Sequence, residues 1–400
     1  MKILHVNEYL SGGGVEQYLK QLFLELDGLG HQNILLYGSD SKLNKNLFKA
    51  EKFLIEKITA VHCDNLNSKL ENVQKIINEK KPDLVYIHQV LNSKLIDYLT
   101  KRLPSIRFAH GFKLVCPEGT KILKSGQKIC EYSLNYACQK HAYHYRCMPR
   151  NFLIGLPLIY NAKKICRIHK ERSLLIVASN FMKSVLIENG FNEKTVKVNP
   201  YFTYLPTICE NFRLKKSKKI LALGRLVKVK GMNYLLDALR ILNENVELDI
   251  VGDGPEMPTL KKMVDQYGLT EKVEFHGWLQ HEKLKNMYMN CSLVIIPSIW
   301  PEPFGIIGIE AMANCKPVVA FNVGGISEWL INGKTGFLIE SQNSKEMAKK
   351  IRILLKNPDL GKKLGWNGRN HVKNRFLASH HLSCLMDTFE KAERIFQHKN

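Results

Sequence analysis

The sequence lacks any run of apolar residues long enough to cross a membrane, since no window approaches twenty uninterrupted apolar residues. It also lacks the apolar segment of a secretory leader: Met1–Asn7 is short and polar, and it is typical of a first strand. We therefore expect the protein in the cytoplasm. There its ten cysteines would mostly be reduced thiols.

Acidic residues are scarce relative to basic ones, 37 against 59, which gives a formal net charge of +22. Nucleic acid, an anionic membrane surface or a phosphorylated substrate could each balance such a charge. No RNP motif, zinc finger or basic-zipper helix is present, so we expect no nucleic-acid partner. A membrane face combined with a polyphosphate substrate is favoured, and scattered solvated lysines are the alternative.

Two motifs that would specify a bound group are absent. The glycine loop Ser11–Gly14 departs from the Gly-x-Gly-x-x-Gly spacing, so it does not predict NAD binding. Within the segment Cys116–Arg150, four cysteines form a loose series without the two- to four-residue separation usual in zinc sites (Cys116, Cys130, Cys138 and Cys147). Buried free thiols are the favoured interpretation. A structural metal or a stabilised loop is the alternative.

Short apolar runs alternate with helical patterns along the whole chain. This alternation predicts parallel sheets covered on both faces, an α/β architecture. Strands are expected at Ile3–Val6, Ile34–Tyr37, Leu84–His88, Ile106–His110, Leu174–Ala178 and Val196–Asn199 in the first half. The second half repeats the scheme at Ile220–Leu223, Leu248–Val251, Val273–His276, Leu293–Ile296, Pro317–Ala320 and Gly336–Ile339. We place a domain boundary near residues 200–217 and expect ligands at the carboxyl ends of the strands, in a cleft between the halves.

The stretch Ser298–Glu310 carries the strongest functional signal. Pro301 and Pro303 bracket Glu302 in a stiff loop, because proline fixes φ and removes a backbone donor. A helix is predicted from near Gly305 through Ala313, and its free N–H groups favour an anion. Glu310 would lie ~7–8 Å further along that helix. Two carboxylates on either side of an anion site suit a nucleotide sugar, although a loop charge and a solvated helix residue are the plainer interpretation of such a pair.

A second loop, Gly224–Gly231, follows a predicted strand and opens a helix. Its cations Arg225 and Lys230 could clamp a diphosphate and offset its charge, and a solvated basic loop is the alternative.

Together these motifs resemble those of the family-4 retaining glycosyltransferases. Ser298–Glu310 is similar to the Glu-x7-Glu signature of that family, Gly224–Gly231 to its Gly-Arg-x4-Lys-Gly element, and Gly252–Glu256 to its Gly-x-Gly-Pro-Glu turn. The resemblance implies that Arg225 and Lys230 bind the donor diphosphate, that Glu302 contacts the donor sugar and that Glu310 holds the ribose. It further implies donor contacts by Gly13, Gly14, Gly252, Trp278, Leu279, Phe304, Gly305 and Ile306. Trp278 could instead be a core residue.

His110, which ends a predicted strand, matches the catalytic histidine of many members. Those members often have Asp after it, where this chain has Gly111. A satisfied structural histidine is the alternative. Within the first half, the Cys116–Arg150 segment would then have an acceptor role.

The resemblance implies a GT-B fold, two Rossmann-like doubly wound domains facing a cleft, with a C-terminal helix that crosses back to the first domain. We expect an acceptor-side domain over residues 1–205, a nucleotide-sugar domain over 206–378 and the crossover helix over 379–400. The implied activity is retaining transfer, of the hexosyltransferase type, from a UDP- or GDP-sugar to a glycan or lipid-linked acceptor. Products could be surface polysaccharide, lipopolysaccharide or capsule.

No Asp-x-Asp triplet occurs in the sequence, so metal-independent transfer with no cofactor is expected. Three alternatives stay open: an epimerase, a phosphorylase and a non-catalytic binder with the same fold. The surplus charge would hold the enzyme peripherally on anionic lipid at the inner face of the plasma membrane.

Overall fold

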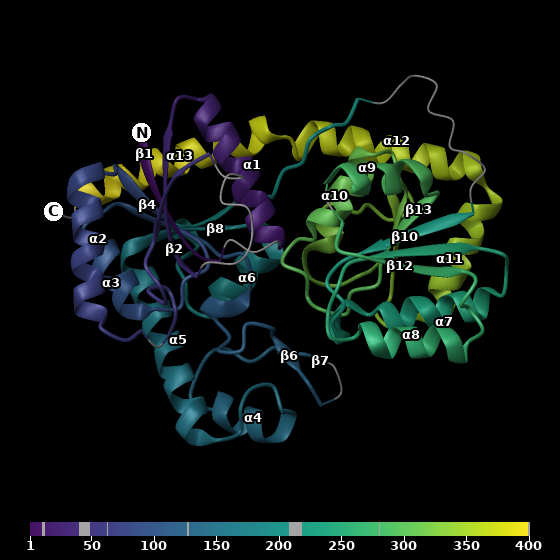
Figure 1. Cartoon of the computed structure of the whole chain (residues 1–400), viewed down its shortest axis with the longest axis horizontal. Coiled ribbons are helices and arrows are strands. Elements are labelled where there is room, and N and C mark those ends of the chain that lie inside the picture. Colours follow the sequence, from purple (N-terminus) through teal and green to yellow (C-terminus); the bar gives the residue numbers. More distant parts are fainter. Residues whose placement is uncertain are drawn as a thin grey trace. The chain divides into compact units, whose positions relative to one another are not determined.

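The computed structural model describes residues 1–9, 13–39, 49–61, 63–125, 128–207, 218–279 and 281–398. The chain divides into two compact units (Figure 1). The first comprises Met1–Pro200 together with His381–Asn400, and the second comprises Tyr201–His380. The sequence placed these divisions at 205 and 378. Part of the boundary segment 200–217 lies outside the described residues.

The first unit contains a seven-stranded parallel sheet in the order β3-β2-β1-β4-β5-β8-β9. Its strands are β1 (Lys2–Tyr9), β2 (Gln32–Ser39), β3 (Glu51–Leu54), β4 (Leu84–Ile87), β5 (Ser105–Phe108), β8 (Ser173–Val177) and β9 (Val196–Val198). The central strands β4, β5 and β8 are buried at every position, as parallel sheets covered on both faces require. Helices α1 (Gly14–Gly28) and α13 (Ala378–Gln397) cover one face (Figure 1). On the other face are α2 (Leu66–Lys80), α3 (Ser93–Thr100) and α5 (Phe152–Arg172), and α6 (Asn180–Glu188) joins β8 to β9.

Between β5 and β8 the chain makes a small substructure. An antiparallel hairpin of β6 (Ile122–Leu123) and β7 (Lys128–Ile129) precedes α4 (Cys138–Tyr145) and the long helix α5. Ile159 of α5 packs with Ala142 and Met148 in a buried cluster. The Asn151 side chain caps α5 by accepting a hydrogen bond from the Leu153 N–H.

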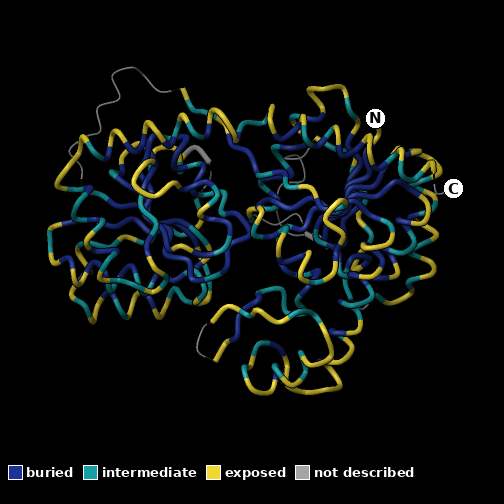
Figure 2. Tube along the Cα trace, turned by 180° about the vertical axis from the view of Figure 1, so that it is seen from behind, coloured by how far each residue is buried: buried dark blue, intermediate teal, exposed yellow. Residues whose placement is uncertain are grey.

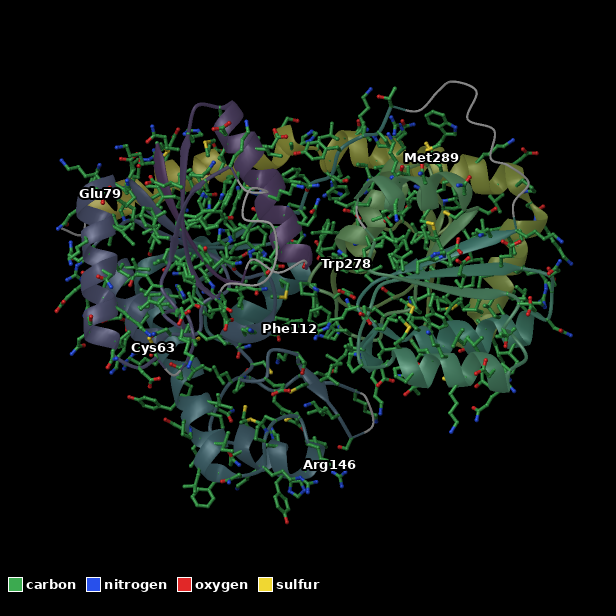
Figure 3. The ribbon with its side chains drawn as sticks, in the orientation of Figure 1. Cys63, Glu79, Phe112, Arg146, Trp278 and Met289 are labelled. Carbon is green, nitrogen blue, oxygen red and sulfur yellow. The ribbon has the colours of Figure 1, made fainter. Side chains whose placement is uncertain are left out.

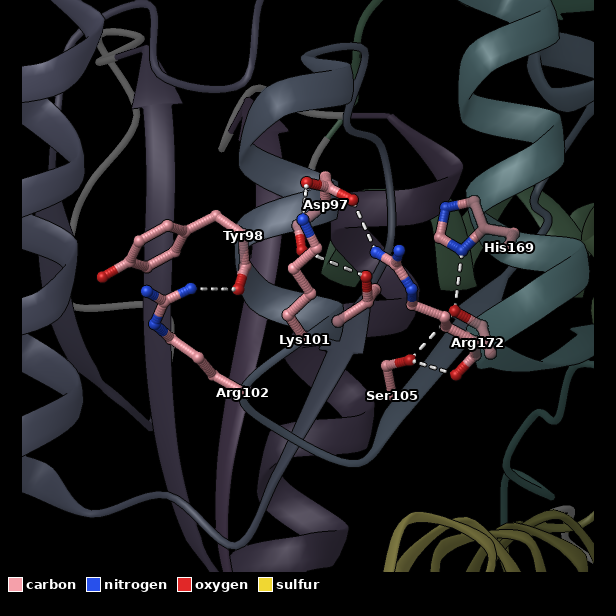
Figure 4. A network of polar contacts seen from close by, with 9 residues as sticks. Asp97, Tyr98, Lys101, Arg102, Ser105, His169 and Arg172 are labelled. Carbon is pink, nitrogen blue, oxygen red and sulfur yellow. Dashed lines mark hydrogen bonds and ion pairs between the residues drawn. The ribbon is translucent and has the colours of Figure 1, made fainter. Parts of the chain in front are cut away.

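A polar network ties β5 and β8 together at their amino ends (Figure 4). The Ser105 hydroxyl lies 2.9 Å from that of Ser173, which in turn lies 2.9 Å from Nδ1 of His169. Arg172, at the end of α5, donates to Asp97 of α3. This network lies at the edge of the sheet opposite the carboxyl ends of the strands, where open α/β sheets bind ligands. It therefore fixes the packing of α3 and α5 and is not part of that edge.

Helix α13 completes the first unit although it lies at the other end of the sequence. Phe389 packs edge-on against Tyr86 with ring centroids 5.5 Å apart, and Leu385 is buried. His381 donates from Nδ1 to the Pro200 carbonyl at 2.7 Å and accepts at Nε2 from the Tyr18 hydroxyl at 2.9 Å. The predicted crossover helix is therefore confirmed as part of the first unit.

The second unit contains a six-stranded parallel sheet in the order β12-β11-β10-β13-β14-β15. Its strands are β10 (Lys219–Leu223), β11 (Glu247–Val251), β12 (Val273–Gly277), β13 (Leu293–Ile296), β14 (Val318–Phe321) and β15 (Gly336–Ile339). Helices α7 (Met232–Leu242), α8 (Met257–Gln266) and α11 (Ser344–Lys356) cover one face, and α9 (His281–Asn290), α10 (Ile306–Ala313) and α12 (Pro358–Arg375) the other (Figure 1).

Burial follows this layering in both units, with buried strands inside a partly exposed helical shell (Figure 2). The predicted architecture of two Rossmann-like units is confirmed, and every predicted strand is present within a few residues of its expected bounds. Among the described helices, none is both long and apolar enough to span a membrane.

Candidate functional site

Most of the predicted site residues gather at the carboxyl edge of the second sheet, where the strand order changes direction. From β10 the chain crosses over one face to β11, and it later returns over the other face to β13. The loops that follow β10 and β13 therefore leave adjacent strands and diverge, which is the position where open α/β sheets bind ligands. These two loops are Gly224–Gly231 and Pro297–Gly305.

Backbone hydrogen bonds hold the two loops against each other. Ile299 and Trp300 both donate their N–H groups to the Val229 carbonyl, at 2.9 and 3.0 Å. The Ser298 hydroxyl donates to the same oxygen at 3.2 Å. The carbonyl of Pro297 occupies the space that a side chain on Gly231 would need. The loops consequently form one structural piece, which fixes the positions of the charges they carry.

The two predicted catalytic charges on these loops pair with each other. Lys230 Nζ lies 2.5 Å from Glu302 Oε1, and the two side chains are 23% and 7% exposed. The same ammonium lies 4.8 Å from the centre of the Trp300 ring. Arg225 differs, because it is exposed and its guanidinium forms no ion pair within the described part of the chain.

The Glu302 loop is pinned to neighbouring segments before α10 begins. Gly325 donates its N–H to the Glu302 carbonyl at 2.8 Å, and the buried Trp329 indole donates to the Phe304 carbonyl at 2.6 Å. Gly305 precedes the helix with φ of +95°, a conformation that favours glycine. Ile306 is the first residue of α10, so the free N–H groups of the helix follow directly after Phe304 and Gly305.

Glu310 lies on α10 and is only partly accessible. Loss of hydration raises its pKa to about 7, and the Tyr288 hydroxyl, 3.5 Å from Oε2, opposes that rise by donating to the carboxylate. Glu310 is thus partly buried, which does not match a fully solvated helix residue. A partly dehydrated carboxylate gains most from donors such as vicinal hydroxyls.

The remaining second-unit residues lie at the ends of β11 and β12. A side chain on Gly252 would collide with the Gly224 carbonyl, so the glycine permits two loops to touch. Trp278 follows β12 and is 66% exposed (Figure 3). The alternative that Trp278 is a core residue is thus wrong. Leu279, beside it, is half-buried.

A group with the spacing of metal ligands lies inside the second sheet, formed by Asp249, Glu274 and His276. Asp249 is buried, and its carboxylate pairs with His276 Nε2 at 2.9 Å and with Lys219 Nζ at 3.3 Å. A lysine ammonium already offsets the Asp249 charge, so these contacts explain the cluster as an ion-paired network.

The first unit holds the other predicted residues. Gly13 precedes α1 and Gly14 begins it, and among the described residues, apart from its chain neighbours and the backbone of α1, none has an atom within 4 Å of a Cβ built on Gly14. Ser11 and Gly12 of the same glycine loop lie outside the described residues. His110 follows β5 and is half-buried, with its Nε2 3.0 Å from Nδ1 of His88. Burial and the nearby Arg107 lower the pKa of His110 well below its usual value.

The four cysteines of the Cys116–Arg150 segment are partly buried free thiols. They lie close enough that Cys116, Cys130 and Cys138 each raise the pKa of Cys147, which burial raises most, to about 11. In the described part of the chain they do not form a ligand group of metal-binding spacing. The loop-stabilising alternative stays open.

Several residues around the site had no recognisable signal in the sequence. Trp300, Tyr288 and Trp329 contact the predicted residues only because segments far apart in the chain meet. For Trp300, its position two residues before Glu302 was the one feature of the sequence that could have drawn attention to it.

Part of the chain is similar in sequence to known proteins. Residues 208–371 match the model of a family described as glycosyl transferases group 1, which is less than half of the chain. The chain is 31% identical over 161 residues to the alpha-D-kanosaminyltransferase of Streptomyces kanamyceticus, covering 40% of this chain and 42% of that protein. It is 30% identical over 174 residues to the capsular polysaccharide biosynthesis glycosyltransferase CapM of Staphylococcus aureus, covering 42% and 45%. These matches span less than half the length of either relative.

Solved structures extend the likeness to the whole chain. The Anabaena protein Alr3699/HepE in complex with UDP superposes with a TM-score of 0.75 at 20% identity, covering 98% of this chain and 100% of that one. This likeness confirms the GT-B fold.

Proposed function

We propose that the protein is a retaining glycosyltransferase that moves a sugar from a nucleoside-diphosphate sugar to a hydroxyl of a glycan or lipid-linked acceptor. The observation that carries the proposal is the pairing of Lys230 with Glu302 at the edge of the second sheet. This pair lies directly before the free N–H groups of α10 and ahead of the partly dehydrated Glu310. The Glu302 carboxylate suits the hydroxyls of the donor sugar. Lys230 and the N–H groups of α10 suit the diphosphate, and the Glu310 carboxylate suits the ribose hydroxyls.

In this proposal the donor diphosphate replaces Glu302 as the partner of Lys230. Exposed Arg225 and the N–H groups at the start of α10 supply further positive charge, which stabilises the leaving nucleoside diphosphate. Glu302, released from Lys230, accepts hydrogen bonds from hydroxyls of the donor sugar. Phe304, Gly305 and Ile306 contribute backbone groups beside it.

The nucleoside would extend toward the other end of the site. Glu310 accepts from the ribose hydroxyls, Gly252 allows the backbone to approach, and Trp278 with Leu279 packs against the base. A uridine nucleotide is the first donor to test, because Alr3699/HepE was solved with UDP. His110, Gly13 and Gly14 of the first unit are proposed to meet the donor sugar and the acceptor.

Transfer would need no metal or cofactor, since the cations of the chain replace the ion that an Asp-x-Asp triplet holds. The likeness to CapM supports an acceptor in capsule or other surface polysaccharide synthesis. The surplus of +22 charges supports a cytoplasmic enzyme attached peripherally to anionic lipid. An epimerase, a phosphorylase or a non-catalytic binder would use the same residues, but none of the contacts given above for the described residues favours them.

A panel of UDP- and GDP-sugars tests the proposal. A true donor at 100 times its dissociation constant should stabilise the protein by roughly 2.7 kcal/mol. That donor should then release free nucleotide slowly without an acceptor and faster with one, and EDTA should leave both rates unchanged. Binding without release would indicate the binder, a need for inorganic phosphate the phosphorylase, and loss on chelation restored by Mn²⁺ would contradict the site.

A further inference from the structure

The start of helix α5 leaves large apolar side chains without a covering partner in the described structure. Phe152, Leu153 and Ile154 are 60%, 70% and 52% exposed. Tyr160, two turns further, and Tyr143 of α4 are also exposed. Further along the same helix the chain is packed, since Ile159 lies in the buried cluster with Ala142 and Met148. Contiguous exposed apolar residues on a folded surface indicate an interaction site. We call this surface the α4–α5 face.

The charge around the α4–α5 face is almost entirely positive. Glu131 is the single acidic residue between positions 131 and 170, whereas that segment has seven basic ones (Lys140, Arg146, Arg150, Lys163, Lys164, Arg167 and Lys170). Arg146, which follows α4, and Arg150 are both exposed, and Figure 3 labels Arg146. Arg150 lies 5.5 Å from the centre of the Tyr143 ring.

We propose that the α4–α5 face inserts its apolar residues into an anionic lipid bilayer. Apolar side chains flanked by tyrosines and basic residues match the chemistry of a membrane interface, where rings sit at headgroup level and cations meet lipid phosphate. A second copy of the chain fits less well, because a two-fold interface would bring the two basic rims together. This surface is independent of the transfer reaction proposed above, so either can fail alone.

Vesicle sedimentation tests the proposal. The native protein should bind phosphatidylcholine vesicles that contain phosphatidylglycerol, bind pure phosphatidylcholine far less, and dissociate as salt rises. The double variant Phe152→Ser, Leu153→Ser should lose about tenfold or more of this binding, since the anchoring apolar groups are gone. The matched control is Leu24→Ser, Leu29→Ser, which removes two exposed leucines of the same unit and should bind as the native protein does.

Equal binding by the double variant and the native protein would overturn the proposal, as would absence of binding to anionic vesicles at low salt. If the native protein instead elutes as a concentration-dependent dimer that the double variant abolishes, a second copy covers the face and the proposal is wrong.

A separate observation concerns three histidines of the first unit: His5 lies on β1, and His88 and His110 lie just after β4 and β5. Nδ1 of His5 lies 3.3 Å from Nε2 of His88, and Nδ1 of His88 lies 3.0 Å from Nε2 of His110. Consecutive rings are nearly parallel, at 8° and 28°, with centroids 5.6 and 5.3 Å apart. His5 and His88 are buried.

Asn33 fixes which atoms of this chain carry hydrogen. Its amide nitrogen donates to the carbonyls of Phe23 and Lys49 at 3.1 and 3.4 Å, so its oxygen faces His5 Nε2 at 3.1 Å and can only accept. His5 must therefore donate from Nε2 and accept at Nδ1. A neutral imidazole has one donor and one acceptor. His88 must therefore donate from Nε2 to His5 and accept at Nδ1 from Nε2 of His110.

We infer that Asn33 and His5 act through His88 as positioning residues that set His110 in its Nε2–H tautomer, with Nδ1 as the acceptor. The rings stay neutral because burial lowers the pKa of His5 to about 3 and that of His88 well below its usual value, and Arg107 and His381 also disfavour charge on His110. The tautomer itself does not depend on the proposed function. Its use, accepting a proton or hydrogen bond from a substrate hydroxyl, does.

Nitrogen NMR of ¹⁵N-histidine-labelled protein reads the tautomer directly and needs no turnover. His110 should show a protonated Nε2 and an unprotonated Nδ1 throughout pH 6–8. Asn33→Leu and His5→Phe should each give a mixture of tautomers at His110 and lower kcat more than they raise KM. His169, bonded to Ser173 outside the chain, provides an unchanged reference signal.

A protonated Nδ1 at His110 in the native protein would overturn the inference. So would an unchanged His110 tautomer in both Asn33→Leu and His5→Phe. If the tautomer shifts as expected and no glycosyl transfer is found in any variant, the proposed function fails while the tautomer assignment stands.

Discussion

Lys230 and Glu302 illustrate what residue-level prediction from this sequence can and cannot achieve. Each was identified by its motif and given a ligand. Their mutual contact, across 72 positions, was not foreseen, because it depends on two loops meeting at the edge of the sheet. If these two side chains bind the donor as proposed, the donor must first displace their ion pair.

Arg225 allows the cleanest test of the phosphate clamp, because its side chain is exposed and its loss leaves no buried charge behind. Arg225→Ala should reduce transfer at least tenfold, since charge-assisted contacts are worth roughly 1.5–3 kcal/mol, with no change in melting temperature. Lys228→Ala, an exposed cation in the same loop, is the matched control and should transfer normally. Steady-state rates for both variants decide the matter, and equal rates would remove Arg225 from the site.

The two glutamates should fail in different kinetic parameters. Glu310→Gln should mainly raise the donor KM, because a ribose contact is made equally in the ground state and the transition state. Glu302→Gln should lower kcat more than it raises KM, since its contacts tighten as the sugar gains positive character. Measured kcat and KM on folded variants test this. The reverse pattern would mean that the donor is oriented the other way.

Glu310 also makes stability depend on pH. Its folded-state pKa of about 7 lies above the ordinary value of 4.5, so the native state holds the extra proton between those values and the free energy of unfolding falls as pH rises through them. At pH 8, Glu310→Gln should therefore melt at a higher temperature than the native protein, with a free energy of unfolding larger by an amount on the order of 1–3 kcal/mol. At pH 4.5 the two proteins should melt at the same temperature. Glu271→Gln, an exposed glutamate of the same unit, serves as control. An equal gain at both pH values would contradict the assignment.

At the scale of single elements, α10 depends on one close approach. A side chain on Gly308 would overlap the ring of Trp329, whose indole holds the Phe304 carbonyl beside the site. Gly308→Ala should destabilise the protein by about 1–3 kcal/mol, because the buried ring cannot move freely. Gly28→Ala in α1, where a Cβ would meet no other side chain of the described structure, should be neutral or stabilising by about 0.5–1 kcal/mol. Chemical denaturation compares the two, and equal stabilities would show that the ring adjusts.

The sequence predicted strands well and the exposed elements poorly, for a physical reason. Strands buried on both faces, such as β4 and β13, read as continuous apolar runs. The edge strand β3 is only partly buried and has no such pattern. Helix α5 was missed, because Pro157 and exposed apolar residues near its start obscure the usual periodicity. The histidine chain could not be found either, since its members are spread over 105 positions, from His5 to His110.

For the whole molecule, the assignment of α13 to the first unit predicts a localised effect of its removal. Deleting residues 379–400 would uncover Tyr86 and Tyr18 and remove buried Leu385 and Phe389. Hydrogen exchange should then accelerate in β1, β4 and α1, while amides of β10 and β13 keep their protection. The double variant Glu390→Ala, Arg394→Ala, which breaks an exposed ion pair on α13, is the control and should leave both units protected. Loss of protection in β10 would show that the two units share one cooperative fold.

The same helix has a consequence for synthesis. The first unit is interrupted in sequence by the second, and it receives its last helix only from residues 381 onward. During translation the second unit leaves the ribosome before that helix does, so it can begin to fold while the first unit still lacks its last helix. The first unit is therefore completed after the second, and its apolar face over Tyr18 and Tyr86 stays available to chaperones until residues 381–397 have left the ribosome.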